Sequence, residues 1–118
     1  APVLLLSVAK LDFEDGSPNR HALYDTGMAA ENLSIQATAL GLVVHQMAGF
    51  HIDQARADCQ IPEGHEPVAM MAVGYPGDPA LLSDRLRERE TQPRARKPLS
   101  DFLYSATWEQ PAPLLGHE

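Results

Sequence analysis

Apolar positions along the chain fall into runs with two different periods. The continuous apolar runs 3–9 and 68–75 are typical of strands that are covered on both faces. The segment 25–40 is different, because its apolar residues leave no wide polar face around a helix axis. We therefore expect two buried strands and one buried helix, with Asp25 as the N-cap of that helix and Gly41 as its left-handed C′ residue.

Turn residues divide the rest of the chain into short elements. A short strand is expected after Gly41, and helices are expected over 53–58, 78–91 and 99–104, with Asp53 and Asp78 as N-caps. This order of strands and helices admits an α/β or an α+β fold. No repeat and no domain boundary is visible, so residues 1–118 are expected to form a single domain.

Composition narrows the functional classes. Nine basic and sixteen acidic residues give a net charge of −7, which argues against a nucleic-acid surface spread over the protein. No apolar run approaches the ~20 residues of a membrane-spanning helix. The single cysteine, Cys59, cannot form an internal disulfide, which fits a reducing compartment such as the cytoplasm. Cys59 is expected to be a buried or half-buried small side chain rather than a nucleophile.

Side chains that carry out catalysis directly are not evident. The sequence contains no nucleophile elbow, no His-Glu-x-x-His motif and no phosphate-binding glycine loop. The five histidines are scattered, and none pairs with another at a spacing that builds a metal site on one element. We therefore predict no metal and no catalytic side chain.

Basic residues are concentrated near the C-terminus, where six of the nine lie between Arg85 and Lys97. The arginines within 85–89 are explained by a solvated helix face. Arg94 and Arg96 are flanked by prolines and lie two residues apart, so in an extended segment they point the same way. Because guanidinium groups bind phosphate oxygens bidentately, this pair predicts a phosphate monoester site.

A second candidate binding segment is Gln46-Met47-Ala48-Gly49-Phe50. The small residues Ala48 and Gly49 allow a flat ligand to approach the main chain, whose N–H groups can then donate to it. A simple turn into the next helix explains the same pattern, and spacing alone favours that simpler interpretation.

Taken in order, several segments resemble the C-terminal half of the FMN-dependent nitroreductase family, and the resemblance extends to about Phe102. The matching segments are Asp25-Thr26-Gly27-Met28-Ala29-Ala30-Glu31-Asn32-Leu33, Gln36-Ala37-Thr38-Ala39-Leu40-Gly41-Leu42, Met47-Ala48-Gly49-Phe50, Ile61-Pro62-Glu63, Glu66-Pro67-Val68, Val73-Gly74-Tyr75-Pro76 and Arg94-Ala95-Arg96-Lys97-Pro98-Leu99.

The resemblance implies an α+β fold with a mixed, mainly antiparallel sheet flanked by helices. It also implies an intertwined homodimer with FMN at the subunit interface, in which helix 26–40 packs in the dimer core. Main-chain groups of Gln46, Met47, Ala48 and Gly49 would lie against the flavin ring, and Arg94 and Arg96 would hold its phosphate. The flavin would carry hydride from NADH or NADPH to an acceptor such as a nitroaromatic or a quinone.

The family's N-terminal part, with its own flavin contacts, has no counterpart here. The resemblance therefore leaves three alternatives. The chain is one piece of a cleaved or incompletely represented nitroreductase, which we favour, or a half-protein completed by another chain. The third alternative is a non-catalytic dimerising remnant of the fold without bound flavin.

Overall fold

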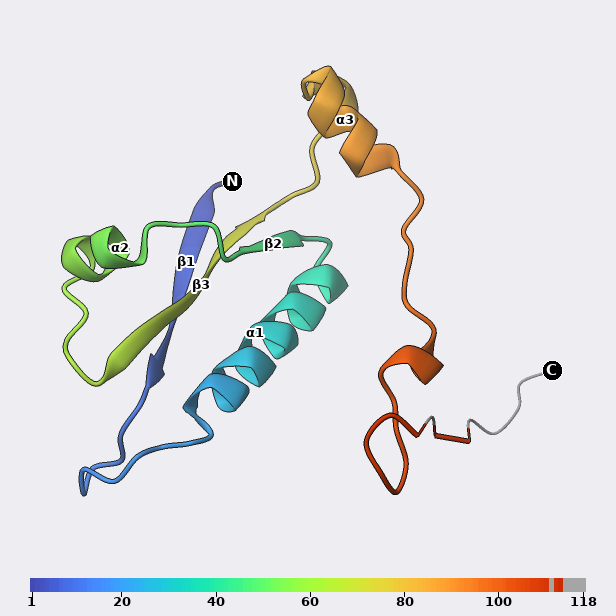
Figure 1. The fold of residues 1–118 in the computed structure, drawn as a ribbon. Helices are drawn as coiled ribbons and strands as arrows, with labels where there is room; N and C mark the ends of the chain where they lie inside the picture. The colour runs from blue at the N-terminus through green and yellow to red at the C-terminus, as the bar shows by residue number, and fades with distance from the viewer. Residues whose placement is uncertain (111, 114–118) are drawn as a thin grey trace. The chain divides into compact units, whose positions relative to one another are not determined.

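The computed structural model describes residues 1–110 and 112–113. Its elements follow one another in the order β1 (Val3–Lys10), α1 (Ala22–Ala39), β2 (Val43–Met47), α2 (Ile52–Asp58), β3 (His65–Gly74), the 3-10 helix η1 (Pro79–Leu81), α3 (Asp84–Thr91) and the 3-10 helix η2 (Leu99–Asp101) (Figure 1). They divide into two compact units, Ala1–Gly77 and Asp78–Glu118. The single domain over 1–118 stays a prediction.

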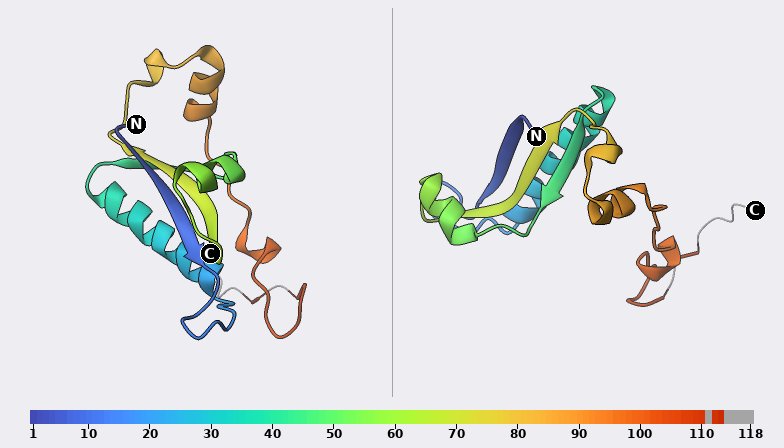
Figure 2. Two further views of the ribbon diagram at one scale, coloured as in Figure 1. Left: turned by 90° about the vertical axis from the view of Figure 1, so that its left-hand side faces the viewer. Right: turned by 90° about the horizontal axis from the view of Figure 1, so that it is seen from above.

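The first unit is built on a three-stranded sheet with the strand order β1-β3-β2. Both strand pairs are antiparallel, and β3 lies in the centre because β1 and β2 each pair with it. Helix α1 contacts all three strands and runs along the sheet, as Figure 2 shows from two further directions. The sheet, the flanking helices and their order confirm the α+β architecture.

A β-bulge interrupts the pairing of β1 with β3. Ser7 lies opposite Ala69 and Val8 lies opposite Pro67, so Val68 is the extra residue. A bulge is where a sheet accommodates proline, which has no N–H to donate to the ladder. The Ser7 hydroxyl donates to the Ala69 carbonyl and accepts from the Ala69 N–H, each at 3.1 Å. The serine side chain thus supplies hydrogen bonds at the irregular position.

Helix α1 packs on the sheet through alanines. Ala22, Ala30 and Ala37 are its buried residues, and they share one face of the helix. Tyr24, Met28 and Ile35 lie opposite this face and are 67%, 46% and 60% exposed. The expected complete burial of the helix is therefore not reached within this chain, because the sheet covers only the alanine face.

The buried apolar residues of the described chain are small. They are five alanines and one methionine, Ala9, Ala22, Ala30, Ala37, Ala55 and Met71, together with Pro67 and Gly74 of β3. The expectation that 3–9 forms a strand is confirmed, but the expectation that both faces are covered is wrong for this chain, since Leu4 is 61% exposed. Leu4 lies on an edge strand, which has a neighbouring strand on one side only.

Two predicted N-caps are wrong. Helix α1 begins at Ala22 with His21 at the N-cap position, because a turn at Asn19 accepts hydrogen bonds from the N–H groups of His21 and Ala22. Asp25 instead lies in the first turn, where its negative charge interacts favourably with the positive end of the helix dipole. The N-cap position of α2 is His51, not Asp53, which also lies in a first turn.

Three other expectations have mixed outcomes. Gly41 follows α1 with φ of +74°, which confirms the left-handed residue at the helix end. Strand β3 begins three residues before the predicted start, at His65. Cys59 is exposed rather than buried, because it is the C-cap residue of the short helix α2.

The second unit contains η1, α3 and η2. Asp78 caps η1 as expected, since its carboxylate accepts from the Ala80 N–H at 2.9 Å. The single helix predicted over 78–91 is wrong, because Leu82 and Ser83 are extended and α3 starts again at Asp84. Ser83 occupies the N-cap position of α3, although its side chain makes no capping hydrogen bond. No residue in the described part of this unit is buried.

Candidate functional site

The connection between β2 and α2 carries the first group of predicted site residues. Strand β2 is an edge strand that ends at Met47, which is half-buried and lies opposite Met70 of β3. Ala48 and Gly49 follow without regular structure and are exposed. A Cβ placed on Gly49 would meet no atom within 4 Å, so the main chain here is open to a ligand on that side.

Main-chain donors in this connection are available for binding. The Phe50 N–H donates to the Ala48 carbonyl at 3.0 Å, which turns the chain toward α2. Among the residues that the structure describes, neither the Ala48 N–H nor the Gly49 N–H donates to a protein acceptor. Two exposed N–H groups beside Gly49, which has no side chain, can donate to a flat ligand that lies against the main chain.

The Gln46 side chain is engaged with α1. Its Nε2 donates to the Ser34 hydroxyl at 3.1 Å, and this hydroxyl donates to the Ala30 carbonyl at 2.8 Å. Sequence reasoning considered only the main chain of Gln46 and missed Ser34. The two residues are twelve positions apart on different elements, so no local pattern could have indicated their contact.

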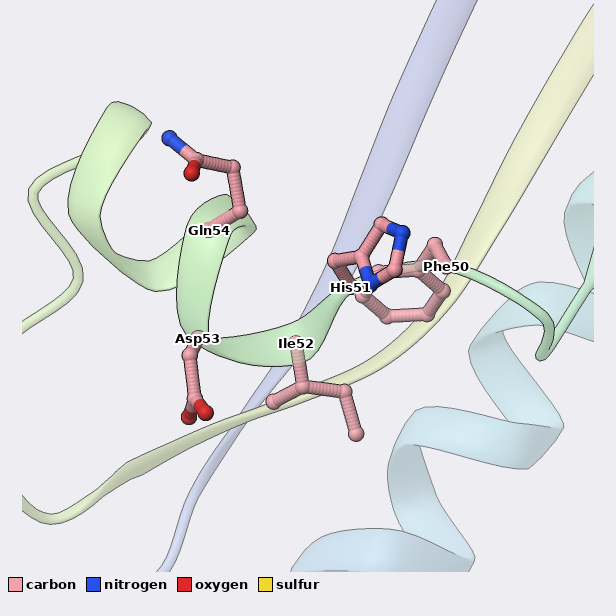
Figure 3. Close-up of a pocket in the computed structure, with 5 residues that line it drawn as sticks. All are labelled: Phe50, His51, Ile52, Asp53 and Gln54. Atoms are coloured by element: carbon pink, nitrogen blue, oxygen red, sulfur yellow. The ribbon is translucent and has the colours of Figure 1, made fainter.

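A shallow hollow follows the connection at the start of α2. It is lined by the consecutive residues Phe50, His51, Ile52, Asp53 and Gln54 (Figure 3). The Asp53 and Gln54 side chains project from the helix in different directions, and no charged group converges on a point there. The hollow therefore offers a mixed apolar and polar surface next to the exposed main chain of Ala48 and Gly49.

Helix α2 is fixed to the start of β3 by Arg56. Its guanidinium donates to the His65 carbonyl at 2.7 Å and to the Glu66 carboxylate at 3.0 Å. This interaction holds the far end of α2 in place and leaves the residues before Ile52 as the exposed part of the connection.

The second group of predicted site residues, Arg94 and Arg96, lies in the second unit between α3 and η2. Both are exposed and have no regular secondary structure. The Arg96 guanidinium donates to the Ala95 carbonyl at 3.0 Å, and no acidic partner within the described residues forms an ion pair with either arginine. Because the two groups of residues belong to different units, their joint contact with one ligand stays a prediction.

A family model and several solved structures relate this chain to one family. The model of the Nitroreductase family matches residues 1–75, a range that contains the β2–α2 connection but not the two arginines. An uncharacterised 15.4 kDa protein of Mycolicibacterium smegmatis is 35% identical over 107 residues, which are 91% of this chain and 72% of that protein.

Solved structures show the same relationship. The crystal structure of an oxidoreductase containing FMN matches 91% of this chain and 56% of its own, with 31% identity and a TM-score of 0.83. A nitroreductase family protein from Clostridium difficile 630 matches 91% of this chain and 60% of its own, with 26% identity and a TM-score of 0.63. The chain thus spans little more than half the length of these structures. The resemblance seen in the sequence is confirmed, and the chain belongs to the nitroreductase family.

Proposed function

We propose that this chain is the flavin-binding part of an FMN-dependent oxidoreductase of nitroreductase type. Family membership supports an oxidoreductase, and the 31% identical relative that contains FMN supports the cofactor. The observation that carries the proposal is the β2–α2 connection, where two N–H groups that have no acceptor among residues 1–110 and 112–113 lie beside the open position at Gly49.

The residues of this connection suit an isoalloxazine ring. Small side chains at Ala48 and Gly49 let the ring approach the main chain, and their N–H groups donate to its acceptor atoms. Arg94 and Arg96 neutralise and bind the phosphate of FMN. When bound, the flavin supplies the hydride transfer, from NADH or NADPH to a nitroaromatic, a quinone or a similar acceptor.

We further propose that the protein works as a homodimer. Tyr24, Met28 and Ile35 form an exposed apolar row on α1, opposite the alanines that face the sheet. An exposed row of large apolar side chains on a helix is typical of a surface that another protein covers. A second copy of α1 in an antiparallel or crossed packing would bury this row.

A non-catalytic dimerising module is the second candidate function. The apolar row on α1 supports dimerisation whether or not flavin binds, and Arg94 and Arg96 lie outside the matched range 1–75. Flavin binding separates the two functions. Purified enzyme that is yellow and releases FMN on denaturation supports the oxidoreductase, and folded protein without affinity for FMN supports the module.

The sharpest test of the flavin contact is Gly49→Ala, compared with Gly77→Ala as a matched control. Both glycines have negative φ and open space around a new Cβ, so neither substitution disturbs the fold of the chain. Only the methyl group at position 49 would meet the flavin. We expect Gly49→Ala to weaken FMN binding at least about fivefold in a fluorescence titration, because overpacking a tight contact costs ~1–3 kcal/mol. Equal affinities for the two variants would refute the proposed contact.

A further inference from the structure

The hydrogen bonds between Gln46, Ser34 and Ala30 connect the edge strand β2 to α1. The Gln46 amide donates to the Ser34 hydroxyl at 3.1 Å, and the hydroxyl donates to the Ala30 carbonyl at 2.8 Å. Gln46 is the penultimate residue of β2, immediately before Met47 and the exposed connection. This is the side-chain hydrogen bond that joins α1 to β2 within the described residues.

The direction of these bonds fixes the orientation of the Gln46 amide. A serine hydroxyl has one proton, and that of Ser34 is directed to the Ala30 carbonyl. The oxygen of Ser34 can then only accept from Gln46, so the amide nitrogen faces the helix. The Gln46 amide oxygen is left as an acceptor that does not contact Ser34.

We propose that Ser34 is a positioning residue for the flavin-binding connection, and this inference rests on the proposed function. Strand β2 is held on one side only, by β3, so its end is free to separate from the sheet. By binding Gln46, Ser34 holds this end against α1 and fixes the start of the loop that presents the Ala48 and Gly49 N–H groups.

The helix itself offers a matched control. The Thr38 hydroxyl makes the same kind of bond to the carbonyl four residues earlier, that of Ser34, at 2.9 Å. Among the described residues, the Thr38 hydroxyl has no hydrogen bond to a side chain of another element. Ser34→Ala and Thr38→Ala therefore remove equivalent helix bonds, and only the first removes the link to β2.

The experiment measures FMN affinity for Ser34→Ala, Thr38→Ala, Gln46→Ala and the double variant of Ser34 and Gln46. We expect Ser34→Ala to weaken FMN binding about fivefold, the effect of one hydrogen bond, while Thr38→Ala changes it less than twofold. In the Gln46→Ala background the Ser34 substitution should add no further loss. Ser34→Thr should keep the wild-type FMN affinity, because a threonine hydroxyl makes the same helix bond at Thr38.

A second measurement keeps the inference separate from the proposed function. Amide hydrogen exchange of the β2 residues that pair with β3 should be faster in flavin-free Ser34→Ala than in flavin-free Thr38→Ala. If the wild-type protein binds no FMN and the two variants still differ in exchange rate, the flavin function is refuted and the positioning role is kept. Equal exchange and equal FMN affinity in the two variants would overturn the positioning role itself.

Discussion

Ile35 gives the most direct test of the proposed dimer. Its side chain is 60% exposed on the face of α1 opposite the alanines. Complete burial of an isoleucine side chain is worth ~1.5–3 kcal/mol, so covering the exposed 60% would contribute about 1–2 kcal/mol. A symmetric dimer uses the same surface twice, which gives about 2–4 kcal/mol per dimer for this position.

The substitution Ile35→Asp should therefore raise the dimer dissociation constant by about 30-fold to 1,000-fold, at 1.4 kcal/mol for each factor of ten. Desolvation of the new carboxylate would add to this loss. The fold of the protomer should change little, because the position is exposed and the helix propensities of isoleucine and aspartate are similar.

Sedimentation velocity over a range of protein concentrations measures the change. Gln36→Asp is the control, since it adds the same charge to the same helix at a position that is already polar and exposed. If Ile35→Asp and Gln36→Asp dissociate at the same concentration as the wild type, α1 does not form the interface and the reasoning fails.

Three further substitutions test other parts of the structure. Ala37→Leu should lower the free energy of unfolding by ~1–3 kcal/mol in urea denaturation, because the new side chain overpacks the buried face of α1, and an unchanged midpoint would contradict that packing. Replacing Arg94 and Arg96 together with alanine should weaken FMN binding at least tenfold but leave riboflavin binding unchanged, since riboflavin has no phosphate; equal losses for both ligands would exclude the phosphate role. Ser7→Ala should cost ~1–3 kcal/mol of stability by removing both hydrogen bonds to Ala69, and thermal unfolding at the wild-type temperature would argue against it.

Local signals in the sequence predicted the elements whose cause is local. Gly41 ends α1 because its left-handed conformation suits glycine, and Asp78 caps η1 through its own carboxylate. The N-terminus of α1 was misplaced because Asn19, an unremarkable polar residue in the pattern, starts the helix through a turn that competes with Asp25 as a cap.

Contacts between segments that are distant in the sequence could not be predicted from the sequence pattern. The pattern of α1 showed apolar residues all round, but it could not show which face meets the sheet, because both faces satisfy the helical period. The structure places alanines such as Ala30 there and directs Met28 and Ile35 outward. The contact of Gln46 with Ser34 on α1 could not be predicted either, because the two residues are twelve positions apart and belong to different elements.

The strand order leaves β1 at an edge of the sheet, and this has a consequence for handling the protein. Residues 3–6 of β1 read Val-Leu-Leu-Leu without a charge, and an uncharged apolar edge is a template for pairing with other chains. The bulge at Ser7 and the charge of Lys10 break the regularity of the second half of the strand only. Refolding from denaturant should therefore compete with aggregation that begins at residues 3–6, and a lysine introduced at Leu4 should raise the soluble yield.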